Sequence, residues 1–284
     1  MYDVSLVGFG DNVVDIYEHT HTSYPGGNSV NVAVHAKRLG AYRCAYLGYF
    51  GSDWAAEQII CALKETGVEL NRCRQIEGES GWSKVTLVNG DRTWLASNKG
   101  GVRGRTPWIA DRFDVEYLSE FDVVHAGNYG FMETELPKLK RAGIPVAFDF
   151  SDDADSEYIR AVAPYVEYAF LSRSGRTKPQ ILEELQKICG YGPSICVATM
   201  GEEGVAAHYS GKFFWQPACQ IGEVVDTMGA GDSLIAAFLL EAISRRKRRV
   251  LTGQDIQDSL LSGTQYAAVV CGIPGAFGFG QPCL

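Results

Sequence analysis

The sequence of 284 residues has no long hydrophobic run and no excess of basic charge. Its longest strictly apolar run, Leu234–Leu240, is far shorter than the ~20 residues that cross a bilayer. The N-terminus has no basic segment ahead of an apolar one, so no secretory signal peptide is expected. The 34 acidic residues outnumber the 26 basic ones, and the net charge of −8 disfavours nucleic acid and membranes as partners.

Common metal-binding and extracellular motifs are missing as well. The eight cysteines form no C-x-x-C pair, no two of the five histidines stand four residues apart, and no N-x-S/T glycosylation acceptor occurs. These absences argue against a zinc knuckle and an H-E-x-x-H site. We therefore expect a cytoplasmic protein whose thiols are free and mostly buried.

Glycine, by contrast, is abundant. The chain has 32 glycines, whereas an average usage of ~7% would give roughly 20. No collagen-like period or low-complexity tract accounts for this excess. It indicates tight turns and places where the backbone must approach a ligand closely.

Short apolar segments alternate with helical ones along most of the chain. The segments with strand character are Val4–Gly8, Val13–Tyr17, Arg43–Tyr49, Val123–Ala126, Val146–Phe150, Ala169–Ser172 and Ile195–Thr199. Helices are expected over Val30–Leu39, from Ser52 or Asp53 to Thr66, and over Glu133–Ala142, Lys178–Cys189, Ala230–Ser244 and Asp255–Val270. This alternation predicts one α/β domain over residues 1–284, with a mainly parallel central sheet flanked by helices.

Two further segments, residues 12–24 and 81–98, consist of short strands. The tripeptide Asn89-Gly90-Asp91 within the second predicts a hairpin turn. Ligands of open α/β sheets bind at the carboxyl ends of the strands. A small β-sheet above that edge would act as a lid.

The segment Asp226–Asp232 reads D-T-M-G-A-G-D and leads directly into an apolar helix. Gly229, Ala230 and Gly231 allow successive N–H groups to point out of the helix N-terminus, which forms an anion hole. Asp232 at its edge suits a general base. Phosphoryl transfer requires both an acceptor for the hydroxyl proton and donors to the transferred group. The alternative is a glycine-rich turn with Asp232 as a helix cap.

A second cluster of polar residues lies near the N-terminus. Asp11 and Asp15 follow the first strand, and Asn28 and Asn31 open the first long helix after Gly26-Gly27. Such compact donors and acceptors suit a polyhydroxyl ligand. The alternative is that Asn28 caps the helix while Asp11 forms a turn.

Two other segments are open to more than one interpretation. Thr199–Gly204, T-M-G-E-E-G, either approaches nucleotide phosphates through its glycines or connects two strands. The basic run Arg245–Arg249 is either a solvated helix C-terminus or a site for a polyanion. Since nothing else in the sequence supports a polyanion, we favour the helix C-terminus.

Two segments together resemble the two signatures of the ribokinase-like (PfkB) carbohydrate kinases: Gly26-Gly27-Asn28 with Asn31, and D-T-x-G-A-G-D at Asp226–Asp232. The resemblance covers essentially the whole chain. It implies a ribokinase-like fold and an ATP- and Mg²⁺-dependent kinase that phosphorylates a primary hydroxyl of a sugar. Residues 10–17, 26–34 and 147–152 are most similar to the fructoselysine 6-kinases of this family, which implies O6 of a fructosamine as the acceptor.

The resemblance also implies roles for individual residues. Asp232 would be the general base, and Gly229, Ala230 and Gly231 the anion hole. The sugar would be held by Asp11, Asp15, Gly27, Asn28 and Asn31, and the nucleotide would lie along Ser172, Thr199, Gly201, Gly204 and Thr227. Many relatives have N-x-x-E where this chain has Ser172-Arg173-Ser174-Gly175. Magnesium would therefore depend on Asp149, largely through water and phosphate.

The sequence leaves several alternatives open. A fructokinase or another small-polyol kinase has the same chemistry, and a non-catalytic sugar- or nucleotide-binding regulator would keep the pocket alone. A dinucleotide-dependent oxidoreductase is disfavoured, because Val13 stands where its fingerprint needs glycine. Tyr17, Trp94 and Tyr129 either pack against an aminoacyl tail or are lid and core residues. A monovalent-cation requirement and a lid-to-lid homodimer are also open.

Overall fold

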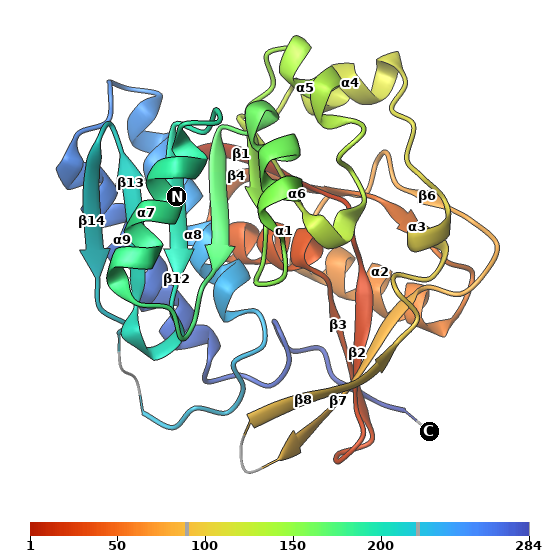
Figure 1. Ribbon diagram of the computed structural model, residues 1–284. Helices are drawn as coiled ribbons and strands as arrows, with labels where there is room; N and C mark the ends of the chain where they lie inside the picture. Colours follow the sequence, from red (N-terminus) through yellow and green to blue (C-terminus); the bar gives the residue numbers. More distant parts are fainter. Residues whose placement is uncertain (89–90, 220–221, 284) are drawn as a thin grey trace.

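The computed structural model describes residues 1–88, 91–219 and 222–283. Its main sheet has the strand order β14-β13-β12-β11-β10-β9-β1-β4 (Figure 1). The six strands from β12 to β4 are parallel to one another, β13 is antiparallel to β12, and β14 is antiparallel to β13. These strands are β1 (Tyr2–Phe9), β4 (Ala41–Leu47), β9 (Val123–Gly127), β10 (Val146–Asp149), β11 (Tyr168–Ser172), β12 (Ile195–Thr199), β13 (Val205–Tyr209) and β14 (Lys212–Gln216). The predicted mainly parallel sheet is confirmed.

Helices cover both faces of this sheet because neighbouring strand residues point to opposite sides. In β1, Leu6 joins one apolar core and Val7 the other. The first core contains α1 (Asn28–Arg38), α2 (Trp54–Thr66), α8 (Ala230–Arg246) and α9 (Gly253–Val270). The second contains α4 (Arg112–Leu118), α5 (Leu136–Arg141), α6 (Ser156–Val162) and α7 (Lys178–Cys189). The result is a three-layer α/β/α arrangement.

A second sheet, with the order β15-β3-β2-β7-β8, lies to one side of the main sheet (Figure 1). It consists of β2 (Val13–Tyr17), β3 (Thr22–Gly26), β7 (Gly81–Val88), β8 (Asp91–Ser97) and β15 (Gln281–Pro282). The two predicted lid segments therefore pair with each other. The C-terminal strand β15 was not expected, since two residues carry no detectable period. Asn89 and Gly90 of the predicted turn lie outside the described residues.

Most of the predicted elements agree with the structure to within a few residues. Asp53 caps α2, and Gly67 ends it in the left-handed conformation. The short helices α3 (Val102–Arg105), α4 and α6 were not predicted, because four to seven residues are too few to show helical periodicity. The hairpin β13–β14 and the short paired strands β5 (Tyr49–Phe50) and β6 (Arg74–Gln75) were also not predicted.

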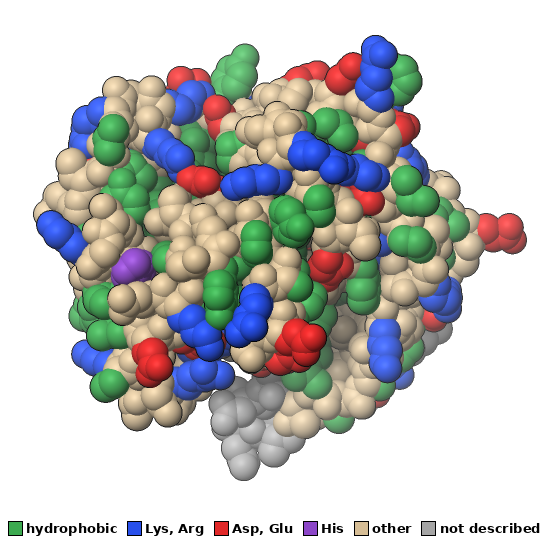
Figure 2. All heavy atoms as spheres, turned by 45° about the horizontal axis from the view of Figure 1, so that its top comes forward, with side chains coloured by type: hydrophobic (Ala, Val, Ile, Leu, Met, Phe, Trp, Pro, Cys, Tyr) green, Lys and Arg blue, Asp and Glu red, His purple; other side chains and the backbone are tan. Residues whose placement is uncertain are grey.

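Two compositional predictions can be compared with the structure. The described cysteines are free, but the prediction that most are buried is wrong: Cys44 and Cys196 are buried, Cys61 is exposed, and the others are partly exposed. The basic run at the end of α8 is neutralised locally, since Arg245 pairs with Glu241 and Asp255. Figure 2 shows acidic, basic and hydrophobic side chains interspersed on one face of the molecule. Every helix of the described residues is too short or too polar to span a membrane.

Candidate active site

The predicted site residues meet at the carboxyl edge of the main sheet. Asp11 follows β1, Asp149 ends β10, Ser172 ends β11 and Thr199 ends β12. These strands are parallel, so their carboxyl ends lie along one edge. The N-termini of α1 and α8 add the polar residues of the two glycine-rich motifs to this edge.

The first turn of α1 is capped by a carboxylate from another segment. Asp11 accepts hydrogen bonds from the Asn28 N–H at 2.6 Å, from the Ser29 N–H at 3.1 Å and from the Ser29 hydroxyl at 2.8 Å. Gly27, at φ 108°, is the N-cap residue, and a Cβ on it would lie 2.8 Å from the Asn12 Cα. The alternative in which Asn28 caps α1 is therefore wrong. Both oxygens of Asp11 thus accept hydrogen bonds from α1. The predicted contact of Asp11 with a sugar stays a prediction.

Asn28 and Asn31 instead hold the carboxylate of Asp232. Asn28 Nδ2 donates to Asp232 Oδ1 at 2.7 Å and to Asp149 Oδ2 at 2.9 Å. Asn31 Nδ2 donates to Asp232 Oδ2 at 2.7 Å. Both oxygens of Asp232 thus face amide donors from α1, about 200 residues away in sequence. Asp232 is not the cap of α8, which has no side-chain cap among the described residues.

One atom of this network has no partner among the described residues. Asn31 is 4% exposed, and its Oδ1 makes no hydrogen bond there. A buried unsatisfied acceptor costs about 1–3 kcal/mol, so it suits a hydroxyl donor from a ligand. Asp15 is also buried, and a Cβ on Gly26 would lie 2.5 Å from its Oδ2. A side chain at position 26 would therefore displace the Asp15 carboxylate.

Asp149 is held between β10 and the network. Its Oδ1 accepts from the Ser151 N–H at 2.9 Å. Burial, followed by the negative charge of Asp232, raises the pKa of Asp149 to about 7. The described residues contain no cluster of three or more side chains that could hold a metal ion by themselves. Oxygen donors from one or two carboxylates, completed by water and phosphate, nevertheless fit Mg²⁺.

The N-terminus of α8 differs from that of α1. Gly229, at φ 73°, begins it, and a Cβ there would lie 2.8 Å from the Ala276 carbonyl oxygen. Space in front of Gly231 is open as far as the described residues show, since none of their atoms lies within 4 Å of a Cβ added there. The first N–H groups of α8 therefore lie at the positive end of the helix dipole without a capping side chain from the described residues.

Asp226 stabilises the loop ahead of α8. Its Oδ1 accepts from the Met228 N–H at 2.9 Å, and its Oδ2 accepts from the Gly275 N–H at 2.9 Å. Tyr17, on β2, donates its hydroxyl to the same Oδ2 at 2.6 Å. Tyr17 is buried, which fits the core alternative and not packing against a ligand's tail. Trp94 and Tyr129 are exposed.

The predicted nucleotide residues lie further along the same edge. Ser172 and Thr199 are partners in the β11–β12 register. Gly201 is the first residue of a short 3₁₀ turn and Gly204 follows it, with φ values of 59° and 104°. A Cβ on Gly204 would lie 2.2 Å from the Gln216 carbonyl oxygen at the end of β14. This close approach to the β14 backbone is enough to explain why position 204 is a glycine. Thr227 is exposed just ahead of α8.

Two buried polar residues at this edge were missed in the sequence. His125, on β9, places its Nε2 2.7 Å from Asn28 Oδ1. Arg173 pairs with Glu184 and donates to the Ser151 carbonyl oxygen, which supports the turn after Asp149. A single polar residue within or just after an apolar strand, as in V-V-H-A-G, was the available signal for both.

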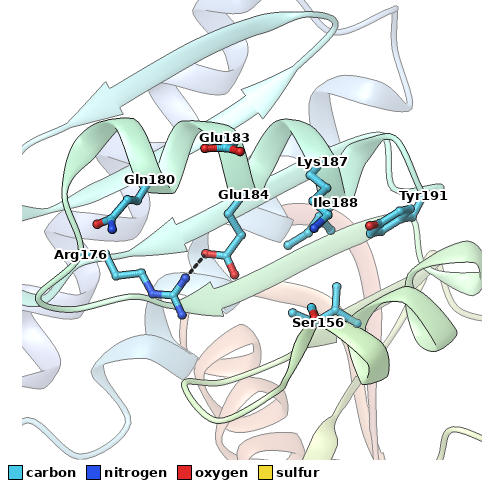
Figure 3. A pocket seen from close by; sticks show the side chains of 9 residues that line it. Ser156, Arg176, Gln180, Glu183, Glu184, Lys187, Ile188 and Tyr191 are labelled. Atoms are coloured by element: carbon cyan, nitrogen blue, oxygen red, sulfur yellow. Dashed lines mark hydrogen bonds and ion pairs between the residues drawn. The ribbon is translucent and has the colours of Figure 1, made fainter.

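A surface hollow of about 310 Å³ lies elsewhere, between α6 and α7. Figure 3 shows Arg176 beside Glu184 in this hollow, with the two side chains joined as an ion pair. None of the predicted site residues lines it. The predicted site residues lie instead at the carboxyl edge of the main sheet.

Comparisons with known proteins agree with this geometry. The family described as pfkB family carbohydrate kinase matches residues 1–279. The chain is 39% identical to fructosamine kinase FrlD of Bacillus subtilis (strain 168), over 98% of this chain and 95% of that protein. It is 33% identical to fructoselysine 6-kinase of Escherichia coli (strain K12), over 83% and 88% of the two chains.

Solved structures with low sequence identity share the fold. Arabidopsis thaliana ribokinase complexed with ribose and ATP has a TM-score of 0.77 at 19% identity, covering 99% of this chain and 96% of that one. Fructokinase with bound ATP from Xylella fastidiosa has a TM-score of 0.75 at 18% identity, covering 99% and 95%. These matches confirm the predicted ribokinase-like fold.

Proposed function

Because the chain belongs to the pfkB family of carbohydrate kinases, we propose that it transfers the γ-phosphoryl group of ATP to O6 of a fructosamine such as fructoselysine. Support for the substrate comes from the relatives named fructosamine kinase and fructoselysine 6-kinase. Support for the chemistry comes from one observation above all. The Asp232 carboxylate stands in the first turn of α8, and amides from α1 hold both of its oxygens.

In the proposed reaction, Asp232 accepts the proton of the attacking hydroxyl. The hydroxyl oxygen bonds to the γ-phosphorus while the bond from that phosphorus to the β–γ bridging oxygen breaks, and ADP leaves. The N–H groups of Gly229, Ala230 and Gly231 stabilise the negative charge on the transferred group. No side chain of the described residues caps α8, but the Ala230 N–H donates to the Thr227 carbonyl oxygen at 3.3 Å and would have to turn from it to the phosphoryl group.

The acceptor would lie on the α1 side of Asp232. Asn31 Oδ1 accepts one of its hydroxyl hydrogens, and Asp15 accepts others from β2. Gly27 allows close approach of the backbone, while Asn28 and Asp11 act by fixing Asp232 and α1. The sheet β15-β3-β2-β7-β8 would close over the sugar as a lid, and Trp94, which is exposed on β8, would pack against the aminoacyl tail.

ATP would lie along Ser172, Thr199, Gly201, Gly204 and Thr227. Magnesium, when bound, neutralises charge on the β- and γ-phosphates. Asp149 would hold it through water, since carboxylates and phosphates supply the oxygen ligands that Mg²⁺ takes. A cytoplasmic location and a homodimer joined through the lid belong to the same proposal.

The test is ADP release from ATP with fructoselysine, other fructosamines, fructose and ribose as acceptors. We expect the highest kcat/KM with a fructosamine. Preference for free fructose would replace the proposal with a fructokinase. Thermal stabilisation by sugar or ATP without ADP formation would replace it with a non-catalytic binding protein. Asp258→Asn, on α9 and outside the site, is the control for Asp232→Asn.

A further inference from the structure

His125 lies at the centre of the main sheet and contacts the active-site network through one atom. It is completely buried on β9, and its Nε2 is 2.7 Å from Asn28 Oδ1. The nitrogen of the same Asn28 amide donates to Asp149 Oδ2 and to Asp232 Oδ1. His125 therefore holds one end of an amide whose other end holds two carboxylates.

An asparagine amide can rotate by 180°, which exchanges its oxygen and nitrogen. In the rotated state Oδ1 of Asn28 would face the oxygens of Asp149 and Asp232, and whenever both carboxylates are ionised three acceptors would meet without a hydrogen. In the observed state both amide hydrogens point to carboxylates. The group opposite Oδ1 must then be a donor, so the hydrogen of the His125 ring is on Nε2.

The environment of His125 keeps it a neutral donor. Burial lowers its pKa to about 3, so the imidazole is uncharged at neutral pH. Its Nδ1 is buried and has no partner among the described residues. An apolar side chain at position 125 would avoid the free-energy cost of burying an unsatisfied nitrogen. A histidine at this position is explained if its Nε2–H is needed as a donor to Asn28.

Gly127 provides the space for this contact. It lies two residues after His125 on β9, so the two residues face the same side of the sheet. A Cβ on Gly127 would lie 2.7 Å from Asn28 Oδ1. One strand thus supplies both the donor and the room for the same oxygen.

We propose that His125 is a positioning residue, whose Nε2–H fixes the Asn28 amide in the orientation that directs its hydrogens to Asp232 and Asp149. This inference rests on the proposed function, in which Asp232 takes the hydroxyl proton. Loss of the donor lets the amide rotate, and Asp232 then keeps only the Asn31 donor on Oδ2. Turnover decreases, whereas ATP binding at β11, β12 and α8 is unaffected.

The kinetic test compares His125→Phe, which has no donor, with His125→Gln, whose amide nitrogen can donate at a similar position. We expect His125→Phe to lower kcat about 10- to 100-fold with KM for ATP within about twofold, and His125→Gln to restore most of kcat. His208→Phe and His208→Gln are the controls, since His208 is buried on β13 in the same sheet, away from the site. Wild-type kcat in His125→Phe, or equal losses in Phe and Gln variants that remain folded, would overturn the inference.

A second measurement does not depend on activity. In ¹⁵N-histidine-labelled protein at pH 7, the His125 ring should be the neutral Nε2–H tautomer, and Asn28→Ala should shift its Nε2–H resonance while leaving that of His208 in place. An Nδ1–H tautomer at His125, or no shift in Asn28→Ala, would overturn the positioning role even if the kinase is active. Absence of turnover with every acceptor would overturn the proposed function, and the tautomer would still decide the role of His125.

Discussion

The N-termini of α1 and α8 both follow glycine-rich turns and both reach the same sheet edge, yet they are used differently. α1 already has a carboxylate at its N-terminus, because Asp11 accepts from its first two N–H groups. α8 has no side-chain cap among the described residues, and Gly231 faces open space. A capped helix end is satisfied within the protein, whereas an uncapped one is suited to an anion. This difference is the reason why the proposed function has the phosphoryl group at α8 and the sugar on the side of α1.

The largest effect is expected at the boundary between the two helix ends. Asp232→Asn keeps the size of the side chain but removes the proton acceptor, so kcat should fall about 10²- to 10⁴-fold. Its amide nitrogen would also meet a donor from Asn28 or Asn31, so the melting temperature should fall as well. Steady-state ADP release and a thermal melt measure both quantities. Full activity in Asp232→Asn would remove the functional distinction between α8 and α1.

Removing the carboxylate at α1 should act on stability first. Asp11→Ala loses hydrogen bonds to Asn28 and Ser29, and we expect the free energy of unfolding to fall by about 1–2 kcal/mol. Because α1 carries Asn28 and Asn31, kcat should fall too. Asp155→Ala is the matched control: Asp155 caps α6 through the Glu157 and Tyr158 N–H groups and not through the residues that hold Asp232. It should lose about 1 kcal/mol and keep wild-type kcat; urea denaturation and kinetics on both variants provide the check.

A smaller effect is expected where the second sheet meets the loop ahead of α8. Tyr17→Phe removes the hydroxyl that donates to Asp226, which costs about 1 kcal/mol of unfolding free energy and lowers kcat a few-fold. Tyr209→Phe serves as the comparison, since its hydroxyl donates to the Leu251 carbonyl oxygen away from the site. Equal kcat values in these two variants would show that β2 does not support the α8 loop.

The last effect concerns the pH dependence of stability. The pKa of Asp149 is raised from 3.8 to about 7, so the folded protein binds this proton more tightly than the unfolded chain. The stability that this group contributes is present below its unfolded pKa and is lost as pH rises toward 7. Wild type should therefore lose stability relative to Asp149→Asn between pH 5 and pH 7.5. Chemical denaturation of both proteins at the two pH values measures this difference, and an unchanged difference would contradict the raised pKa.

Local patterns accounted for much of the architecture. Strand β12 and helix α7 have the predicted bounds, because each is a contiguous apolar or amphipathic segment with clear ends. The N-terminus of α8 was predictable for the same reason, since D-T-M-G-A-G-D contains its turn and its carboxylate within seven residues. Short elements such as α6 and β15 were not predictable, because they show no period.

The contacts of α1 were not predictable to the same degree. Its cap, Asp11, comes from 17 residues earlier, and its Asn28 meets His125 from 97 residues later and Asp232 from 204 residues later. Nothing within the segment Gly26–Asn31 indicates which of these partners it contacts. The sequence therefore suggested Asn28 as a cap or a sugar ligand, whereas its amide is occupied by Asp149, Asp232 and His125.

By itself the sequence determined the order of strands and helices, the glycines of the α8 turn and the types of polar residue at the sheet edge, because these depend on neighbouring residues. Only the tertiary structure decided which carboxylate caps α1, which one is held by Asn28 and Asn31, and which helix end remains without a cap. Those choices depend on the register of parallel strands and on the packing of α1 against β1 and β9, which bring residues far apart in the chain within hydrogen-bond distance.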